Sequence, residues 1–221
     1  MWTQILPFVL AAIVGFRHAF EPDHLAAVSN IVTKRNSPVL AMKDGIFWGL
    51  GHSSSLLVVG ILMLSLRWAI PDKGFQIMEG GVGVMIILLG IFRLRQFFKQ
   101  PSHTHIHTHD GVTHIHTHTH EESHKHRHKL SYGVGIIHGL AGSGVLIVAA
   151  MAAMKTVGTS LLFIAVFSIG CIAGMMVAAG ILGLPFSKRL QTFKNIQSGL
   201  VIFSCAICLI LGSKIMIENW F

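Results

Sequence analysis

Six apolar stretches, each long enough to cross a lipid bilayer, set the strongest limit on what this chain can fold into. A helix needs roughly 20 mostly apolar residues to span the hydrocarbon core of a membrane. Nothing here shows the alternation of a membrane β-barrel, and a backbone inside lipid must satisfy its own hydrogen bonds. The sequence therefore predicts an all-α, polytopic membrane protein with about six transmembrane helices. The stretches lie near residues 3–31, 38–66, 76–98, 131–154, 159–184 and 195–218.

The composition agrees with a membrane protein. Apolar residues make up 52% of the 221 positions and charged residues only 12%, with a mean hydropathy of +0.65. Soluble domains usually carry about twice that share of charge. The first stretch lacks a basic leading region and a small-residue cleavage site, so we do not expect a cleaved signal peptide.

The basic residues predict how the chain lies in the membrane, because lysine and arginine favour cytoplasmic connections. With the N-terminus outside, twelve of the seventeen fall on the inner side, four on the outer side, and Arg17 within the first stretch. We therefore expect a multi-pass protein of the cytoplasmic membrane with both termini outside. The formal charge of +8 is then largely a topology signal, and no nucleic-acid partner is expected.

A histidine-rich segment divides the chain into residues 1–98 with three helices, 99–129 as a loop, and 130–221 with three more. The loop alternates histidine with threonine and has few apolar residues, so we expect it to be flexible and, by the charge count, cytosolic. Imidazole at this density suits nickel, cobalt, copper or zinc, which predicts an auxiliary metal site; a solvated linker without a metal role stays open. The loop histidines are His103, His105, His107, His109, His114, His116, His118, His120, His124, His126 and His128.

The other four histidines, His18, His24, His52 and His138, each lie inside an apolar stretch. An ionisable side chain at bilayer depth is costly, so it usually faces a partner or a cavity and marks a functional site.

Two of these histidines flank a proline in "RHAFEPDH". On a regular helix His18, Asp23 and His24 would not share a face, because five and six residues turn a helix by about 140° and 240°. Pro22 lacks the N–H that would bond the His18 carbonyl, which predicts a break before it. The break would turn all three side chains toward one point and free that carbonyl for an ion. Two imidazoles and a carboxylate suit a transition metal better than Mg²⁺ or Ca²⁺.

The same stretch contains H-x4-D-H, and the second stretch contains "GLGHSSSLLVVG" around His52. These motifs resemble the nickel/cobalt transporter family, most closely its short UreH-type nickel permeases. Segments around His138 and Ser168 resemble the UreH type as well, although no carboxylate stands near Ser168 where longer members of the family have one. The resemblance implies a six-span permease for Ni²⁺, with Co²⁺ open as a second substrate. It implies no enzyme activity and no cofactor, with cytosolic nickel chaperones as further partners.

The five expected metal ligands lie in the first, second and fourth apolar stretches. They are His18, Asp23, His24, His52 and His138, supported by Glu21, Pro22, Ser53 and Ser54.

A short internal similarity predicts two related halves. "VGFRH" ends at His18 and "VGIIH" ends at His138, each in the first apolar stretch of its half. Three spans per half would make the halves inverted in the membrane, the usual architecture for alternating access. The metal would then lie between the halves. Three identical residues in five also occur by chance, so both interpretations stay open.

Two alternatives remain for the function and a third for the polar cluster of the first stretch. A nickel or cobalt efflux protein of the same superfamily is one, because related exporters also carry a histidine-rich loop. A membrane reservoir or chaperone that binds metal without moving it is the second. The third is that the first stretch holds only an internal ion pair between Arg17 and Glu21, with hydrogen-bonded histidines.

The amount of metal bound by two variants distinguishes a reservoir from a transporter with an intramembrane site. If the spans only anchor a metal-binding loop, His18→Ala leaves the metal content of the purified protein unchanged and deletion of 103–128 abolishes it. With an intramembrane site, we expect the loop deletion to retain about one ion and His18→Ala to weaken its binding, because a ligand is lost. Elemental analysis of both variants after equilibrium dialysis measures this.

Overall fold

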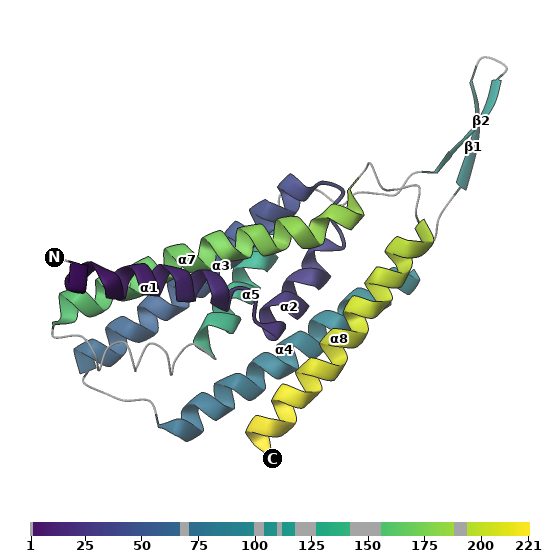
Figure 1. Ribbon diagram of the computed structural model, residues 1–221. Coiled ribbons are helices and arrows are strands. Elements are labelled where there is room, and N and C mark those ends of the chain that lie inside the picture. Colours follow the sequence, from purple (N-terminus) through teal and green to yellow (C-terminus); the bar gives the residue numbers. More distant parts are fainter. Residues whose placement is uncertain are drawn as a thin grey trace.

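The computed structural model describes residues 2–66, 71–99, 104–109, 112–117, 127–141, 156–187 and 194–221 (Figure 1). Within these ranges the chain is helical apart from one short hairpin. Its elements are α1 Trp2–His18, α2 Pro22–Val32, α3 Pro38–Leu66, α4 Asp72–Lys99, β1 Thr104–His109, β2 Val112–Thr117, α5 Arg127–Leu140, α7 Val157–Gly183, the 3-10 turn Leu184–Phe186 and α8 Lys194–Trp220.

Four of the described helices, α3, α4, α7 and α8, are long and apolar enough to cross a membrane, and the bent pair α1–α2 makes up to five. Large apolar side chains such as Ile13, Phe92 and Ile210 are exposed on these helices, as a lipid-facing surface requires. The prediction of a multi-pass helical membrane protein is confirmed. The predicted span 131–154 begins in α5, and its remainder lies outside the described residues.

The helices form two groups with α2 between them. α3 packs against α5 and α7, α1 packs against α7, and α4 runs antiparallel beside α8 (Figure 1). α2 contacts α3, α4, α7 and α8, and its buried residues Ala26, Ala27, Val28 and Val32 lie at the centre of the apolar core. An 11-residue helix is only about 16 Å long, so α2 reaches partway through a bilayer.

Polar contacts fix both sides of α2. The hydroxyls of Ser29 and Ser204 lie 2.7 Å apart and join α2 to α8. Between α2 and α4, the Arg93 guanidinium of α4 donates to the Thr33 hydroxyl at 2.7 Å and to the Thr33 carbonyl at 3.2 Å. A cation there also suits the negative end of the α2 dipole. The short helix is therefore held in place at its C-terminal end.

Glycines allow α3 and α5 to lie against each other. A Cβ atom at Gly135 would collide with the Trp48 carbonyl and come within 2.9 Å of the His52 nitrogen, and a Cβ at Gly51 would collide with the Tyr132 carbonyl. Small residues at such points let helix backbones approach closely. This contact sets the depth at which His52 and His138 face each other.

Two further helix pairs are built the same way. In the α1–α7 pair, Gly15 lies against the Phe167 carbonyl and Gly170 against the Ala12 carbonyl. In the α4–α8 pair, a Cβ at Gly83 would lie 2.7 Å from the Gly212 carbonyl oxygen, and a Cβ at Gly212 would lie 2.7 Å from the Gly83 carbonyl oxygen. Each pair is thus joined by glycines from both partners.

The histidine-rich segment contains an antiparallel hairpin, which the sequence did not predict. β1 pairs with β2 so that His105 faces His116 and His107 faces His114. Threonine and isoleucine between the histidines favour strands, and Asp-Gly is a common sequence between paired strands. The hairpin projects beyond the helices (Figure 1). The all-α prediction is confirmed for the helical body, and the two strands are confined to these residues, where β-branched residues alternate with histidine.

The packing of α5 generates a matched pair of substitutions. We expect Gly135→Ala to destabilise the folded, detergent-solubilised protein by about 1–3 kcal/mol, because the new methyl group would push α5 away from α3. The variant should therefore be lost from solution at a lower temperature. Gly133→Ala, two residues earlier, should be neutral or slightly stabilising, since none of the described residues lies within 4 Å of a Cβ there. Equal stability of both variants in a heating series read by size exclusion would contradict this packing.

Candidate metal centre

The predicted break in the first span is confirmed. α1 ends at His18, α2 begins at Pro22, and their axes bend by 55°. Glu21, with extended backbone angles, precedes the proline, which stands in the first turn where a missing N–H costs nothing. The prediction that the His18 carbonyl is free is wrong. This carbonyl accepts a hydrogen bond from the Glu21 N–H at 3.1 Å, because the chain turns tightly before α2 starts.

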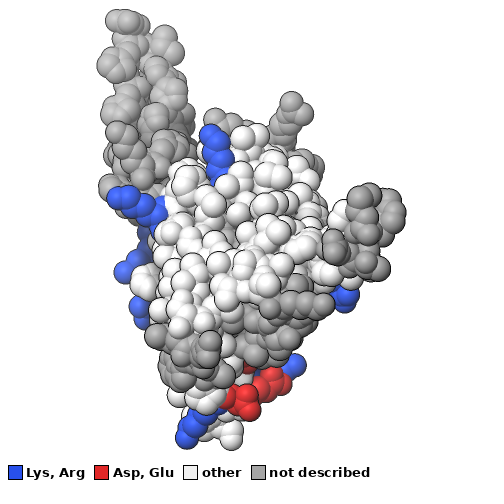
Figure 2. All heavy atoms as spheres, turned by 90° about the vertical axis from the view of Figure 1, so that its left-hand side faces the viewer, with Lys and Arg blue, Asp and Glu red and all other residues white. Residues whose placement is uncertain are grey.

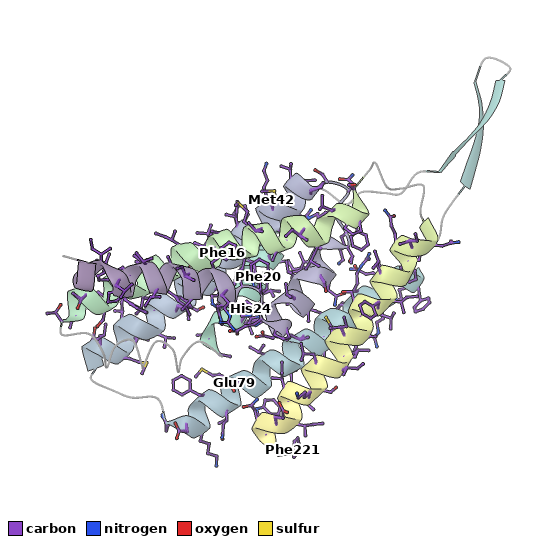
Figure 3. All side chains as sticks on the ribbon, viewed as in Figure 1. Phe16, Phe20, His24, Met42, Glu79 and Phe221 are labelled. Carbon is purple, nitrogen blue, oxygen red and sulfur yellow. The ribbon has the colours of Figure 1, made fainter. Side chains whose placement is uncertain are left out.

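The break brings four histidines from four helices together. The ring centre of His24 lies 4.5 Å from that of His18, 5.2 Å from His52 and 4.2 Å from His138. None of the four is more than 3% exposed. Figure 3 shows His24 in the interior, where α1 and α2 meet. His52 and His138 thus lie beside the first-span histidines, as the sequence predicts.

Two overlapping groups in this cluster have the spacing of metal ligands. His18, His24 and His52 each offer a nitrogen within 4.8 Å of the others, and Asp23, His24 and His138 form a second such group. His24 belongs to both. An ion could therefore be held at either of two neighbouring positions, or pass from one to the other while staying bound to His24.

Asp23 orients two of the imidazoles. Its carboxylate lies 3.2 Å from His24 Nδ1 and 2.8 Å from His138 Nε2. An ionised carboxylate only accepts hydrogen bonds, so both of these nitrogens carry the proton. His24 Nε2 and His138 Nδ1 then keep their lone pairs, which is how a carboxylate prepares imidazoles for a metal. Asp23 therefore has a positioning role beside its predicted role as a ligand.

The remaining imidazole nitrogens have no hydrogen-bond partner within the described part of the chain. They are both nitrogens of His18 and of His52, Nε2 of His24 and Nδ1 of His138. Glu21 Oε2 lies 2.9 Å from His18 Nδ1, near enough for an ion pair but without hydrogen-bond alignment. A buried polar atom left unpaired costs about 1–3 kcal/mol. Such a concentration of unpaired nitrogens indicates a place built for a ligand.

Aromatic rings enclose the cluster. The indole of Trp48 lies 5.4 Å from His24 and 5.6 Å from His138, and the Phe167 ring lies 5.7 Å from His18. These apolar walls exclude competing oxygen ligands on one side and strengthen electrostatic interactions within the cluster.

The predicted supporting residues divide into two kinds. Ser53 is buried, and its hydroxyl has no partner among the described residues. Ser54 instead donates to the Leu50 carbonyl and accepts from the Tyr132 hydroxyl, so it is not brought to the cluster. Glu21 approaches His18, and no ion pair joins it to the exposed Arg17 in the described structure. The ion pair of the third alternative is therefore not formed.

Most of the predicted loop ligands lie outside the described side chains. His128, at the start of α5, is the exception: its Nδ1 lies 3.0 Å from the buried carboxylate of Asp44, and its ring stacks on Phe47 at 4.8 Å. Arg35 and Ser131 bond the same carboxylate. The last histidine of the loop is thus tied to the helical body.

A cavity of about 420 Å³ opens beside the cluster. Its lining includes His18, Asp23 and His24, and on the opposite side Glu79 of α4 and Glu218 of α8. Neither glutamate was among the residues predicted from the sequence. Glu79 lies inside the apolar stretch 76–98, so the argument that selected the buried histidines would have selected it too.

A buried histidine cluster at a broken helix in a multi-pass helical membrane protein is an arrangement suited to a metal-ion transporter. The chain is a member of the family described as high-affinity nickel-transport protein, which it matches over residues 4–212.

Three relatives illustrate this membership. The urease accessory protein UreH of Bacillus sp. (strain TB-90) is 32% identical over 80% of this chain and 76% of its own length. The nickel transporter NixA of Staphylococcus aureus is 32% identical over 39% of this chain and 28% of its own length. A high-affinity nickel transport protein of Cupriavidus necator is 28% identical over 39% of this chain and 25% of its own length. No solved structure is significantly similar to the chain.

The family resemblance drawn from the motifs is therefore confirmed. Nickel stands to this family as a transported substrate and not as a resident cofactor, and the family is one of transporters and not of enzymes.

Trp48 provides a direct test of binding at the cluster. In a variant with Trp2, Trp68 and Trp220 replaced by phenylalanine, we expect Ni²⁺ to quench the fluorescence of Trp48 saturably, because an open-shell ion at His24 would lie close to the indole. His24→Ala should abolish the saturable quenching, and Zn²⁺, with its closed d shell, should compete for the site while quenching less. Unchanged quenching in the His24→Ala variant would exclude the cluster as the binding site.

Proposed function

We propose that this protein is an uptake permease that moves Ni²⁺ across the cytoplasmic membrane through the cluster of His18, Asp23, His24, His52 and His138. The observation that carries the proposal is the set of unpaired, buried imidazole nitrogens at the broken first span. Nitrogen ligands with one carboxylate suit a borderline transition metal, and the family described above transports nickel. Co²⁺ accepts the same ligands and is the expected competing substrate.

Alternating access is supported by contacts that repeat between the halves. Gly15 and Gly135 hold matching places in "VGFRH" and "VGIIH", and each lies against a helix of the opposite half: Gly15 against Phe167, Gly135 against Trp48. Exchanging the halves turns the α1–α7 contact into the α3–α5 contact. The α4–α8 contact would map onto itself, as the reciprocal glycines there do. These relations support an inverted repeat of the two halves.

The turns after the two matching histidines agree as well. The Glu21 N–H donates to the His18 carbonyl at 3.1 Å, and the Ala141 N–H donates to the His138 carbonyl at 3.3 Å. Each histidine carbonyl thus accepts a bond from the N–H three residues on, although α1 ends at His18 and α5 at Leu140. One histidine from each half faces the cluster. Rocking of one half against the other would open the cluster to each side of the membrane in turn.

The inward direction of transport follows from the distribution of basic residues and from the membrane potential. With the basic residues inside, the termini face outward and the histidine-rich segment faces the cytosol. A divalent cation moving inward through 100 mV gains about 4.6 kcal/mol, twice the single-charge value, which supports an accumulation on the order of a thousandfold. Inward movement needs no other energy source. The loop histidines would receive the ion and pass it to cytosolic nickel chaperones.

Nickel flux into proteoliposomes of known orientation tests the proposal. We expect inward flux to rise with a negative-inside potential and to fall at least about tenfold in His18→Ala and His52→Ala, because each removes a ligand. His114→Ala, which removes one imidazole from the loop, is the matched control and should keep most of the initial rate.

Two results would overturn the assignment. Unchanged initial rates in both point variants would remove the cluster from the pathway. Flux only against the potential, and only with a proton gradient, would place the protein among the efflux proteins of the superfamily.

A further inference from the structure

We propose that the cavity beside the histidine cluster is a second, outer cation site, which holds hydrated divalent cations before Ni²⁺ exchanges its waters for imidazole. We name it the vestibule; its outer wall is formed by Glu79, Glu218 and Asn219, and His18, Asp23 and His24 lie at its inner end. This inference rests on the proposed function and adds two binding residues to it.

The vestibule has the size for a hydrated ion. Its volume is about 420 Å³. Six water molecules occupy about 180 Å³ at their share of liquid volume, so a hexahydrated cation fits with space for further waters. The ion can therefore reach the imidazoles before losing its hydration shell, and the cost of removing the waters falls where nitrogen ligands replace them.

The charge of the vestibule has one sign. Glu21, Asp23, Glu79 and Glu218 line it, and no lysine or arginine does so among the described residues. Lys214 approaches Glu218 at 3.7 Å, but both side chains are about two-thirds exposed, so this pair is weak. A cleft lined by one sign of charge concentrates ions of the opposite sign. Figure 2 shows carboxylates at the lower end of the molecule, with basic side chains beside them.

The ligand atoms differ between the two ends of the vestibule. Its outer wall offers carboxylate oxygens and Asn219, whose amide nitrogen donates to the Ile215 carbonyl at 2.9 Å and leaves its own oxygen free to accept. Oxygen ligands do not separate Ni²⁺ from Mg²⁺, whereas imidazoles favour the transition metal. His18 and His24, which carry buried and unpaired nitrogens, line the same space. The vestibule would therefore collect divalent ions without selection, and the histidine cluster would select.

The position of the two glutamates indicates on which side of the membrane the vestibule opens. Glu79 lies near the start of α4 and Glu218 near the end of α8, and these antiparallel helices bring both to the end opposite the hairpin (Figures 1 and 3). With the topology proposed above, that end is the outer face. The outer site thus lies on the side from which an uptake permease receives its ion.

Initial nickel uptake by proteoliposomes at low ionic strength tests the vestibule. We expect the half-saturating Ni²⁺ concentration to rise roughly threefold in Glu79→Gln and in Glu218→Gln and about tenfold in the double variant, with the maximal rate unchanged. Asp72→Asn, which removes a carboxylate from the same end of α4 but not from the cavity lining, is the matched control and should behave as wild type.

Inhibition by Mg²⁺ and the effect of high salt provide two further measurements. Millimolar Mg²⁺ should inhibit the wild type competitively and the double variant much less, and the difference between them should shrink in 1 M salt, where the Debye length is about 3 Å. If both glutamate variants saturate at the same Ni²⁺ concentration as Asp72→Asn, or if only the maximal rate falls, the vestibule is overturned. Glu218 is 60% exposed, so its replacement should not disturb folding. The Glu218→Gln variant therefore still tests the vestibule if Glu79→Gln fails to fold.

Binding separates this inference from the proposed function. In a His24→Ala background, where transport is lost, equilibrium dialysis of the purified protein should still show a weak Ni²⁺ site that Mg²⁺ displaces. Adding Glu79→Gln and Glu218→Gln should remove that component, and its persistence would overturn the vestibule even if the wild type carried no nickel. Transport by the wild type that His24→Ala leaves intact would instead overturn the histidine cluster.

Discussion

The cost of placing polar groups at bilayer depth is the constraint on which this structure depends. A regular helix from residue 2 to residue 32 would point His18, Asp23 and His24 in different directions, each needing a partner. The break at Pro22 resolves this by ending one helix at His18 and starting another that carries the other two. Because α2 is short and fixed between α4, α7 and α8, its first turn stays at the centre of the molecule.

The helices around the break serve the same cluster. α3 and α5 approach closely through Gly51 and Gly135, and this close packing lets His52 and His138 reach the first span. The Asp23 carboxylate then holds His24 and His138 in fixed tautomers, leaving one lone pair on each ring. Backbone packing and side-chain chemistry are thus linked: loosening either helix pair would spread the ligands before any ligand was removed.

Much of this was predictable from the sequence, and the reasons for the failures are physical. Residue type and proline placement predicted the break and the four buried histidines, since both follow from local chemistry. The His18 carbonyl was wrongly predicted free because the turn geometry supplies the Glu21 N–H, which no residue pattern reveals. Glu218 escaped notice because its cavity is formed by helices far apart in sequence. Ser54 was assigned by motif, yet it faces Tyr132 on a different side of α3 from His52.

Nickel K-edge X-ray absorption tests the central claim most directly: that the broken first span gathers imidazoles around a nickel ion. The sample is the full-length protein with the loop histidines from His103 to His126 replaced by asparagine, loaded with one equivalent of Ni²⁺. The account predicts a nickel shell dominated by imidazole nitrogen, with about three rings, which loses a ring in His24→Ala. A shell of oxygen atoms alone, or a spectrum that His24→Ala leaves unchanged, would contradict it.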